Sequence, residues 1–336
     1  MILKLVLAMA VSFAVTSVIG LILIPKLRKI KAGQSILEDG PVWHMPKQGT
    51  PTMGGIMFIV GIGAACLAVG FKNVLDGEFS HLIIFVFALL YGVIGFLDDY
   101  EKLKKKQNLG LTAIQKIVLQ LVMAVVLIFA MRLNGMLTTA LYIPFANIMV
   151  EIPEGAYFVL AAFVIVGTVN SVNLTDGVDG LVTGVTLPVA LCYIFICYAW
   201  RNVGIGIFSA ALFGGLLAFL IYNYNPAKIF MGDTGSLFLG GAVCGIAFAL
   251  DIPLILVLVG IIYILEALSD IIQVAYYKIT RGKRIFKMAP LHHHFEMGGW
   301  SGEKWSEKKV FWVFSIVSAA FCAIAYYSII GRLSFF

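Results

Sequence analysis

Residues 223–236 read Asn-Tyr-Asn-Pro-Ala-Lys-Ile-Phe-Met-Gly-Asp-Thr-Gly-Ser and connect two apolar runs, at 205–222 and 236–250. A polar connection between two such runs is expected at a membrane surface. Its single acid, Asp233, lies between two glycines, which let backbone N–H groups point outward, and the next helix offers its positive N-terminus to an anion. The stretch is therefore either a Gly-rich turn in which Asp233 caps a helix, or a site where Asp233 binds a metal ion beside phosphate oxygens.

The composition excludes a water-soluble domain. The 336 residues are 61% hydrophobic and 12% charged, with a mean hydropathy of +0.98. A helix needs about 20 apolar residues to cross a bilayer, and the runs lack the polar–apolar alternation of barrel strands. We predict an all-α, polytopic membrane protein, a single domain over residues 1–336 with about ten transmembrane helices. The candidate spans are residues 2–24, 53–71, 81–97, 114–131, 156–171, 182–199, 205–222, 236–250, 253–277 and 310–330.

Lys and Arg residues indicate the orientation of such a protein, because cytoplasmic loops carry more of them. When the loop at 25–52 is placed inside, 19 of the 24 Lys and Arg residues fall in inside loops. We therefore expect both termini on the periplasmic or extracellular side and five loops in the cytoplasm. The net charge of +6 reflects this sidedness and gives no reason to expect a nucleic acid partner. The outside segment at 132–155 is expected to be a short amphipathic or hairpin excursion.

Asp98 and Asp99 end the third apolar run. Acids this close to hydrocarbon suggest a function, although an ordinary polar helix end is the alternative. Two adjacent carboxylates repel each other unless a cation lies between them, so the pair is a candidate for a general base or for Mg²⁺ ligands. Lys102 and Lys116 flank this membrane boundary and are candidates to contact a bound phosphate.

The loop after the fifth apolar run contains Asn173, Asp176 and Asp179 but no Lys or Arg. A spacing of three residues would place the three side chains on one face of a helical turn. The loop is either an Asp/Gly turn or a site for a ligand or metal, and its uncompensated negative charge favours the second interpretation.

Two further features of the ninth run and the following loop are unusual. Glu266 and Asp270 interrupt an apolar helix at a spacing of four residues, so they either face the bundle interior or mark a broken helix that opens a lipid-side groove. The loop then contains the triplet 292–294, His-His-His. Three consecutive side chains cannot easily converge on one zinc ion, and no Cys lies near. We interpret them as hydrogen-bonding and charged groups for phosphate oxygens, with a plain loop triplet as the alternative.

Carboxylates, lysines and a Gly-rich anion site on one membrane side suit a magnesium-assisted phosphoryl transfer. One substrate would be water-soluble, such as a nucleoside diphosphate derivative, and the other a lipid phosphate. A transporter of anionic nucleotide sugars is the alternative from another class. It should show paired broken helices from an internal repeat, which the sequence lacks, and polar residues in both membrane halves.

Five motifs, in order between residues 47 and 300, resemble those of the phospho-N-acetylmuramoyl-pentapeptide transferase family, a branch of the polyprenyl-phosphate N-acetylhexosamine-1-phosphate transferase superfamily. The triple histidine after Met-Ala-Pro distinguishes this branch from sister transferases that use UDP-N-acetylglucosamine, which remain the nearer alternative. The motifs are Gly49-Thr50-Pro51-Thr52-Met53-Gly54-Gly55, Leu97-Asp98-Asp99-Tyr100, Asn173-Leu174-Thr175-Asp176-Gly177-Val178-Asp179-Gly180-Leu181, Phe230-Met231-Gly232-Asp233-Thr234-Gly235-Ser236 and Met288-Ala289-Pro290-Leu291-His292-His293-His294-Phe295-Glu296.

The resemblance implies that UDP-N-acetylmuramoyl-pentapeptide and undecaprenyl phosphate give lipid I and UMP, with Mg²⁺ as cofactor. It also implies a multi-pass, homodimeric protein of the bacterial cytoplasmic membrane, in contact with membrane lipid. Asp233 would bind Mg²⁺ and Asp98 would act as base for the lipid phosphate. The implied catalytic residues are Asp98, Asp99, Asp233 and His292. The implied substrate-binding residues are Lys47, Thr52, Lys102, Lys116, Asn173, Asp176, Asp179, Asn223, His293 and His294. Direct attack by the lipid phosphate and a covalent aspartyl intermediate both remain open, and we favour direct attack.

Overall fold

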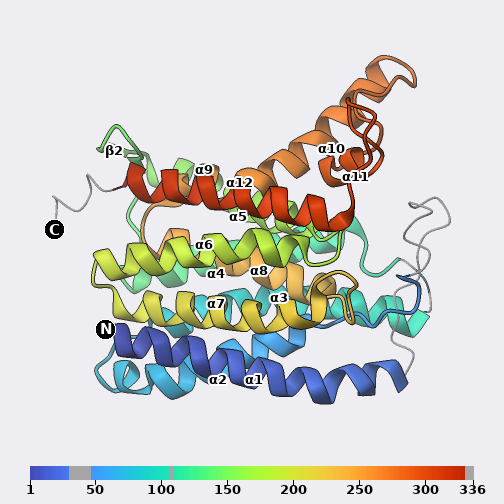
Figure 1. Ribbon diagram of the computed structural model, residues 1–336. Helices are drawn as coiled ribbons and strands as arrows, with labels where there is room; N and C mark the ends of the chain where they lie inside the picture. Colours follow the sequence, from blue (N-terminus) through green and yellow to red (C-terminus); the bar gives the residue numbers. More distant parts are fainter. Residues whose placement is uncertain (30–46, 106, 108, 330–336) are drawn as a thin grey trace.

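The computed structural model describes residues 1–29, 47–105, 107 and 109–329. The predicted inside loop at 25–52 and the last predicted span therefore lie partly outside the described residues. Long helices run side by side in a bundle, and the start of α1 lies near the end of α12 at one end of it (Figure 1). The long helices are α1 (Ile2–Lys29), α2 (Gly55–Leu75), α3 (Ser80–Lys105), α4 (Ala113–Leu133), α5 (Glu154–Thr175), α6 (Leu181–Ala199), α7 (Val203–Asn223), α8 (Gly232–Ala249), α10 (Ile261–Ile279) and α12 (Glu307–Ser328).

The predicted number of spans agrees with the bundle. Among the described residues, nine helices are long and apolar enough to cross a membrane, and one bent helix pair makes a possible tenth. A polytopic membrane protein is thus confirmed. The helical expectation needs one correction, because β1 (Ala140–Ile143) and β2 (Ile148–Glu151) form an antiparallel hairpin. The hairpin option for the segment at 132–155 is therefore the one that the chain adopts.

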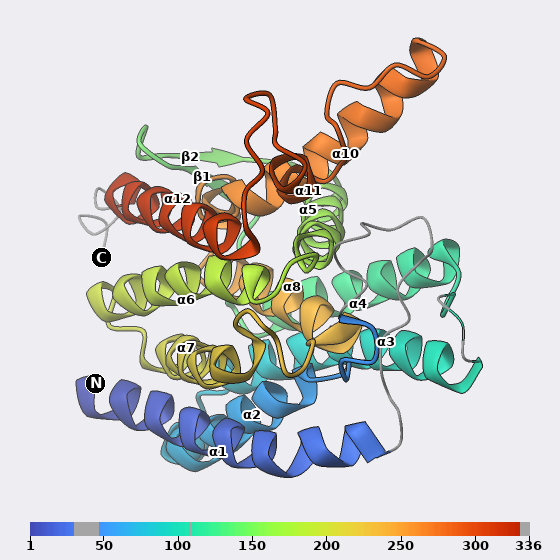
Figure 2. The ribbon, with the colours of Figure 1, turned by 45° about the vertical axis from the view of Figure 1, so that its right-hand side comes forward.

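The span that corresponds to the ninth apolar run is broken close to its start. A 3-10 turn, η2 (Pro253–Ile255), and α9 (Leu256–Val259) meet α10 at an angle of 79°. The break occurs at Gly260, where an added Cβ would come within 2.5 Å of the Leu256 carbonyl oxygen. After the break, α10 leans away from the bundle (Figures 1 and 2). Glu266 is completely buried and so faces the bundle interior, whereas the break lies six residues before it, at Gly260.

Helix α8 is the centre of the bundle, and its side chains are buried almost throughout. It packs against α2, α3 and α5, which surround it in Figure 2. Glycines make the closest approaches possible. A Cβ on Gly95 of α3 would lie 2.0 Å from the Asp233 carbonyl oxygen, and one on Gly55 of α2 would lie 2.3 Å from the Gly235 Cα. The first turn of α8 is therefore fixed between α2 and α3.

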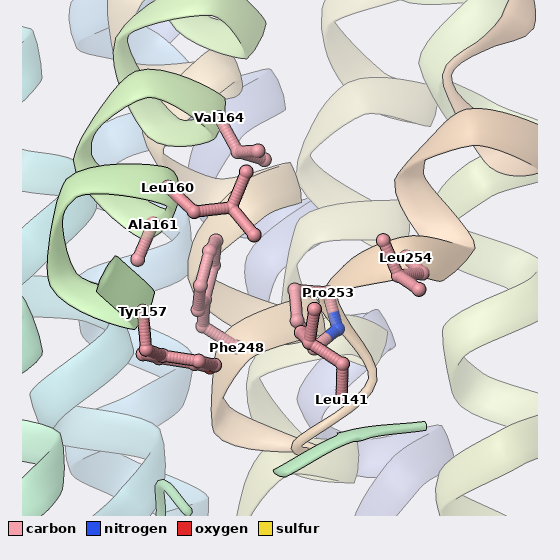
Figure 3. Close-up of a pocket in the computed structure, with 8 residues that line it drawn as sticks. All are labelled: Leu141, Tyr157, Leu160, Ala161, Val164, Phe248, Pro253 and Leu254. Carbon is pink, nitrogen blue, oxygen red and sulfur yellow. The ribbon is translucent and has the colours of Figure 1, made fainter. Parts of the chain in front are cut away.

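An apolar pocket lies at the other end of α8, between α5, the hairpin and the broken helix (Figure 3). Tyr157, Phe248 and Pro253 are among the residues that line it, and none of its lining residues is charged. Phe248 follows Asp233 by 15 residues, which is roughly 22 Å along a helix. The pocket is therefore remote from the polar end of α8 and has no charged group that would bind a phosphate.

We predict that Gly95→Ala destabilises the protein, because its methyl group would overlap the Asp233 carbonyl. Overpacking of this kind costs about 1–3 kcal/mol, so the melting temperature in detergent should fall. Gly167→Ala in α5 is the matched control, since a Cβ there meets nothing within 4 Å and alanine favours a helix by about 1 kcal/mol over glycine. Equal melting temperatures for the two variants would contradict the close α3–α8 approach.

Candidate active site

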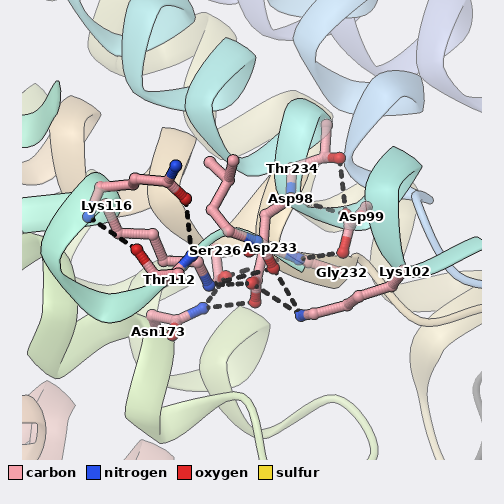
Figure 4. A network of polar contacts seen from close by, with 12 residues as sticks. Asp98, Asp99, Lys102, Thr112, Lys116, Asn173, Gly232, Asp233, Thr234 and Ser236 are labelled. Atoms are coloured by element: carbon pink, nitrogen blue, oxygen red, sulfur yellow. Dashed lines mark hydrogen bonds and ion pairs between the residues drawn. The ribbon is translucent and has the colours of Figure 1, made fainter. Parts of the chain in front are cut away.

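Three carboxylates converge where the C-terminal part of α3 meets the first turn of α8. Oxygen atoms of Asp98, Asp99 and Asp233 all lie within 4.8 Å of one another, and Figure 4 shows the three acids close together. Asp98 and Asp99 are buried and Asp233 is half-buried. The two sequence motifs, separated by more than a hundred residues, therefore form one acidic cluster as predicted.

Two lysines bridge this cluster. The Lys102 Nζ lies 2.6 Å from Asp98 Oδ2 and 3.0 Å from Asp233 Oδ2. The Lys116 Nζ lies 3.0 Å and 2.8 Å from the same two oxygens. The ammonium groups thus compensate the repulsion between the two carboxylates, which buried acids require. The two lysine side chains are 32% and 23% exposed, so they also provide two partly exposed cations beside the acids.

The two adjacent acids of α3 have different roles in the fold. Asp99 accepts hydrogen bonds from the Asp233 N–H (3.2 Å), the Thr234 N–H (2.9 Å) and the Thr234 hydroxyl (2.7 Å). It thus satisfies free N–H groups in the first turn of α8. Asp98 instead accepts from the Leu111 N–H (2.8 Å) and faces the lysines. The alternative that Asp233 caps its own helix is wrong, because Asp99 from α3 satisfies these groups.

Asn173 joins α5 to the same cluster. Its side-chain amide donates to Asp233 Oδ1 (2.9 Å) and to the Ser236 hydroxyl (2.7 Å). One Asp233 oxygen therefore contacts an amide and the other contacts two ammonium groups. Thr52 is buried nearby, since a Cβ on Gly232 would approach the Thr52 hydroxyl to 2.7 Å.

A second polar cluster joins the segment before α2 to the start of α12. The Lys47 Nζ lies 2.7 Å from Asp179 and 2.6 Å from Glu307. The Asn225 amide donates to both carboxylates, at 3.1 and 3.2 Å, and the Ala227 N–H donates to Asp179 at 2.9 Å. The sequence analysis missed Asn225 and Glu307. Of these two residues, only Glu307 could have been noticed in the sequence, as an acid in the first turn of a helix that is capped by a serine.

Asp176 interacts electrostatically with acids of both clusters. Burial raises the pKa of Asp176 well above its ordinary value, and the negative charges of Asp233, Asp99 and Asp179 raise the pKa further. The prediction that one helical face carries Asn173, Asp176 and Asp179 is wrong, because α5 ends at Thr175 and Asp176 is its C-cap. The acids are brought together by the turn that follows instead.

Asn223 is buried and stabilises the loop between α7 and α8. It accepts a hydrogen bond from the Thr183 hydroxyl (3.1 Å) and donates to the Ile229 carbonyl oxygen (3.0 Å). These two hydrogen bonds help to hold the loop that precedes α8 in its conformation.

The His triplet forms the short helix α11 (Leu291–Glu296), and its members face different surroundings. His292 Nδ1 lies 2.9 Å from Glu266 of α10. The opposite side of its ring packs on the loop that carries Asp176 and Asp179, since a Cβ on Gly177 would approach His292 Nε2 to 2.2 Å. His293 pairs instead with Glu296, with 2.7 Å between His293 Nδ1 and the carboxylate.

His294 belongs to an aromatic cluster. It is buried, and its ring centroid lies 4.4 Å from that of Trp300 and 5.5 Å from that of Phe286. Its Nδ1 accepts a hydrogen bond from the Lys287 N–H at 3.1 Å. Burial lowers the pKa of His294, and the positive charge of Lys287 lowers it further. His292 therefore contacts the loop that carries Asp176 and Asp179.

The donor set of the acidic cluster fits a magnesium ion. Asp98, Asp99 and Asp233 provide carboxylate oxygens within one ion's reach of each other, and Mg²⁺ prefers oxygen ligands with one or two protein carboxylates. Asp233 is the most accessible of the three, being half-buried. The neighbouring ammonium groups of Lys102 and Lys116 suit phosphate oxygens of a metal-bound ligand.

We predict that Asp176→Asn stabilises the protein at pH 7. A carboxyl with a raised folded-state pKa holds its proton longer in the folded than in the unfolded chain, so stability falls as pH rises from about 4 through that folded pKa. Asparagine has no charge to bury, so the variant should not lose this stability at pH 7. Each kcal/mol of stability regained should raise the melting temperature by about 2–4 °C. Melting curves between pH 4 and 8 provide the measurement, with the exposed Asp76→Asn as control. A lower melting temperature for Asp176→Asn at pH 7 would contradict this electrostatic assignment.

Comparisons with known proteins agree with this geometry. The model of the family described as Glycosyl transferase family 4 matches residues 81–251, and Phospho-N-acetylmuramoyl-pentapeptide-transferase signature 1 matches residues 47–59. The phospho-N-acetylmuramoyl-pentapeptide-transferase of Clostridium perfringens (strain SM101 / Type A) is 48% identical over 329 residues, 97% of each chain. The protein of the same name from Caldanaerobacter subterraneus subsp. tengcongensis is 45% identical over 98% of this chain and 100% of its own. The chain therefore belongs to the family of phospho-N-acetylmuramoyl-pentapeptide transferases, within glycosyl transferase family 4.

Proposed function

We propose that this protein transfers phospho-N-acetylmuramoyl-pentapeptide from UDP-N-acetylmuramoyl-pentapeptide to undecaprenyl phosphate, with lipid I and UMP as products. The observation that carries the proposal is the convergence of Asp98, Asp233 and two lysines at one end of a membrane bundle. Such a site combines anion-binding cations with metal-binding oxygens, which a reaction between two phosphates needs. The names of relatives along nearly the whole chain support the same reaction.

In this proposal Asp233 binds Mg²⁺, assisted by Asp98 and the backbone-bound Asp99. The bound metal ion would neutralise charge on the pyrophosphate. Lys102 and Lys116 lie between the two acids, where they can exchange carboxylate partners for phosphate oxygens and orient them. Because Mg²⁺ also binds substrate oxygens, a complete cage of protein ligands is unnecessary.

We propose direct attack by the lipid phosphate. One of its oxygens forms a bond to the sugar-linked phosphorus, the pyrophosphate bond breaks, and UMP leaves with the bridging oxygen. Asp98 accepts any proton still held by the lipid phosphate, since it faces the lysines while Asp99 is engaged by α8. A phosphate dianion is already a nucleophile, so an aspartyl intermediate is not needed.

The cluster of Lys47, Asp179, Asn225 and Glu307 offers donors and acceptors for the nucleoside part of the UDP-sugar. His292 and Asp176 would contact the diphosphate between the two clusters. We keep the other proposed substrate contacts as well, which are Thr52, Asn173, Asn223, His293 and His294. We further propose that the site faces the cytoplasm in a bacterial inner membrane and that the protein is a homodimer.

We predict that Asp233→Asn lowers the rate of UMP release by about 10²–10³-fold, the loss typical of removing one strong electrostatic group from an active site. The assay supplies undecaprenyl phosphate, Mg²⁺ and UDP-N-acetylmuramoyl-pentapeptide in detergent, and UDP-N-acetylglucosamine tests the sister activity. Asp270→Asn is the control, because Asp270 lies on α10 outside the acidic cluster. Full activity of Asp233→Asn, or a preference of the wild type for UDP-N-acetylglucosamine, would count against the proposal.

We also predict that Mg²⁺ alone raises the melting temperature of the chelator-treated protein. A ligand that binds only the folded state stabilises it by about 2.7 kcal/mol at 100 times its Kd. Asp233→Asn should lose this shift and Asp270→Asn should keep it. An equal shift in both variants would indicate that Mg²⁺ binds elsewhere, whatever the outcome of the activity assay.

A further inference from the structure

The tip of α10 carries exposed cations that the proposed reaction does not use. No ion pair to an acid holds these side chains within the described part of the chain, in contrast to Lys47, Lys102 and Lys116. The nearest acid on the same helix, Asp270, precedes the first of them by eight residues, roughly 12 Å along a helix. The five exposed cationic residues, called the basic tip below, are Lys278, Arg281, Lys283, Arg284 and Lys287.

Hydrogen bonds fix the chain at the basic tip. After Ile279 the chain turns through Gly282, at φ +116°, where the Gly282 N–H donates to the Tyr277 carbonyl oxygen. The returning segment is then bound to α10 by Gln273. Its Oε1 accepts from the Ile285 and Phe286 N–H groups, both at 3.1 Å, and its Nε2 donates to the Phe286 carbonyl oxygen at 3.0 Å. The last turn of α10, with Lys278, and the hydrogen-bonded segment after it, with the other four cations, therefore have a defined backbone.

The half of α10 that leads to the basic tip is apolar and exposed around most of its circumference. Ile271 is 62% exposed, Ile279 is 81% exposed, and Ile272, Val274 and Tyr277 are each more than 40% exposed. Figures 1 and 2 show this half leaving the bundle. In a membrane protein such a surface is expected to contact lipid tails. An apolar stem that ends in cations matches the boundary between tails and headgroups.

We propose that the basic tip binds the headgroups of anionic phospholipids, on the same membrane side as the acidic cluster. The tip lies at the end of the bundle where α3 ends (Figure 1). Each Lys or Arg near an anionic bilayer surface contributes about 1 kcal/mol of attraction, within a Debye length of about 10 Å at 0.1 M salt. The fixed turn presents five such charges together. The inference concerns the surrounding bilayer, so it does not depend on which substrates the enzyme uses.

The test compares wild type with the triple variant Lys278→Gln/Lys283→Gln/Arg284→Gln in nanodiscs of mixed zwitterionic and anionic phospholipid. A fluorophore is attached to Ile279→Cys, which is selective because all five native cysteines are buried. Brominated phosphatidylglycerol and brominated phosphatidylcholine then quench the label in separate samples. We expect the anionic lipid to be enriched at least about fivefold around the wild-type tip, the factor equal to ~1 kcal/mol. The enrichment should fall with added salt and should approach one in the triple variant.

The matched control is Lys104→Gln/Lys304→Gln/Lys308→Gln, which removes the same charge from exposed lysines outside the basic tip. It should keep the wild-type enrichment. Equal quenching by the two brominated lipids around the wild type would overturn the proposal. So would equal loss in the two triple variants, because the enrichment would then follow net charge. Elution as a single species in size-exclusion chromatography verifies that each variant is folded.

Discussion

The hydrogen bonds between Asp99 and the first turn of α8 are the constraint on which the site depends. They join a side chain of α3 to backbone N–H groups of Asp233 and Thr234, and Gly95 allows the helices to come close enough to form them. Once this turn is fixed, Asp233 has to project toward Asp98, with the two lysines between them. Of the two adjacent acids in α3, Asp99 therefore holds the first turn of α8, while Asp98 contacts the two lysines.

The electrostatics of the cluster follow from its place at the end of a buried helix. Removing one partner of a buried ion pair typically costs about 3–5 kcal/mol, because the other charge stays buried and unpaired. Here each lysine contacts two acids and each of those acids contacts two lysines. Neither lysine is committed to a single partner, so an incoming phosphate can take one contact without leaving an acid uncompensated. The helix N-terminus adds positive potential at the same point.

Sequence alone predicted the elements and the main cluster. Long apolar runs indicated the spans, and acids at their ends indicated Asp98 and Asp233. Which partner each polar group takes was not predictable, because the partners are distant in sequence. Asp99 with Thr234 and Lys47 with Glu307 are separated by 135 and 260 residues. The regular spacing of Asn173, Asp176 and Asp179 was misleading, because the helix that would place them on one face ends at Thr175, before the first of the two acids. The aromatic surroundings of His294 could not be predicted either, because nothing in the sequence distinguishes it from the two histidines before it.

The bent helix connects the lipid side of the protein to the acidic loop. Glu266 lies near the start of α10, and its contact with His292 Nδ1 is completely buried. When Nδ1 donates to this carboxylate, Nε2 remains as an acceptor unless the ring is protonated. That side of the ring rests against Gly177, where a side chain would not fit, next to Asp176. A displacement of α10 would therefore also move the His292 ring, which contacts the loop between the two polar clusters. The His292 ring is thus held from two sides, by the carboxylate of Glu266 and by the backbone at Gly177. Helix α10, which carries Glu266, therefore fixes the orientation of His292.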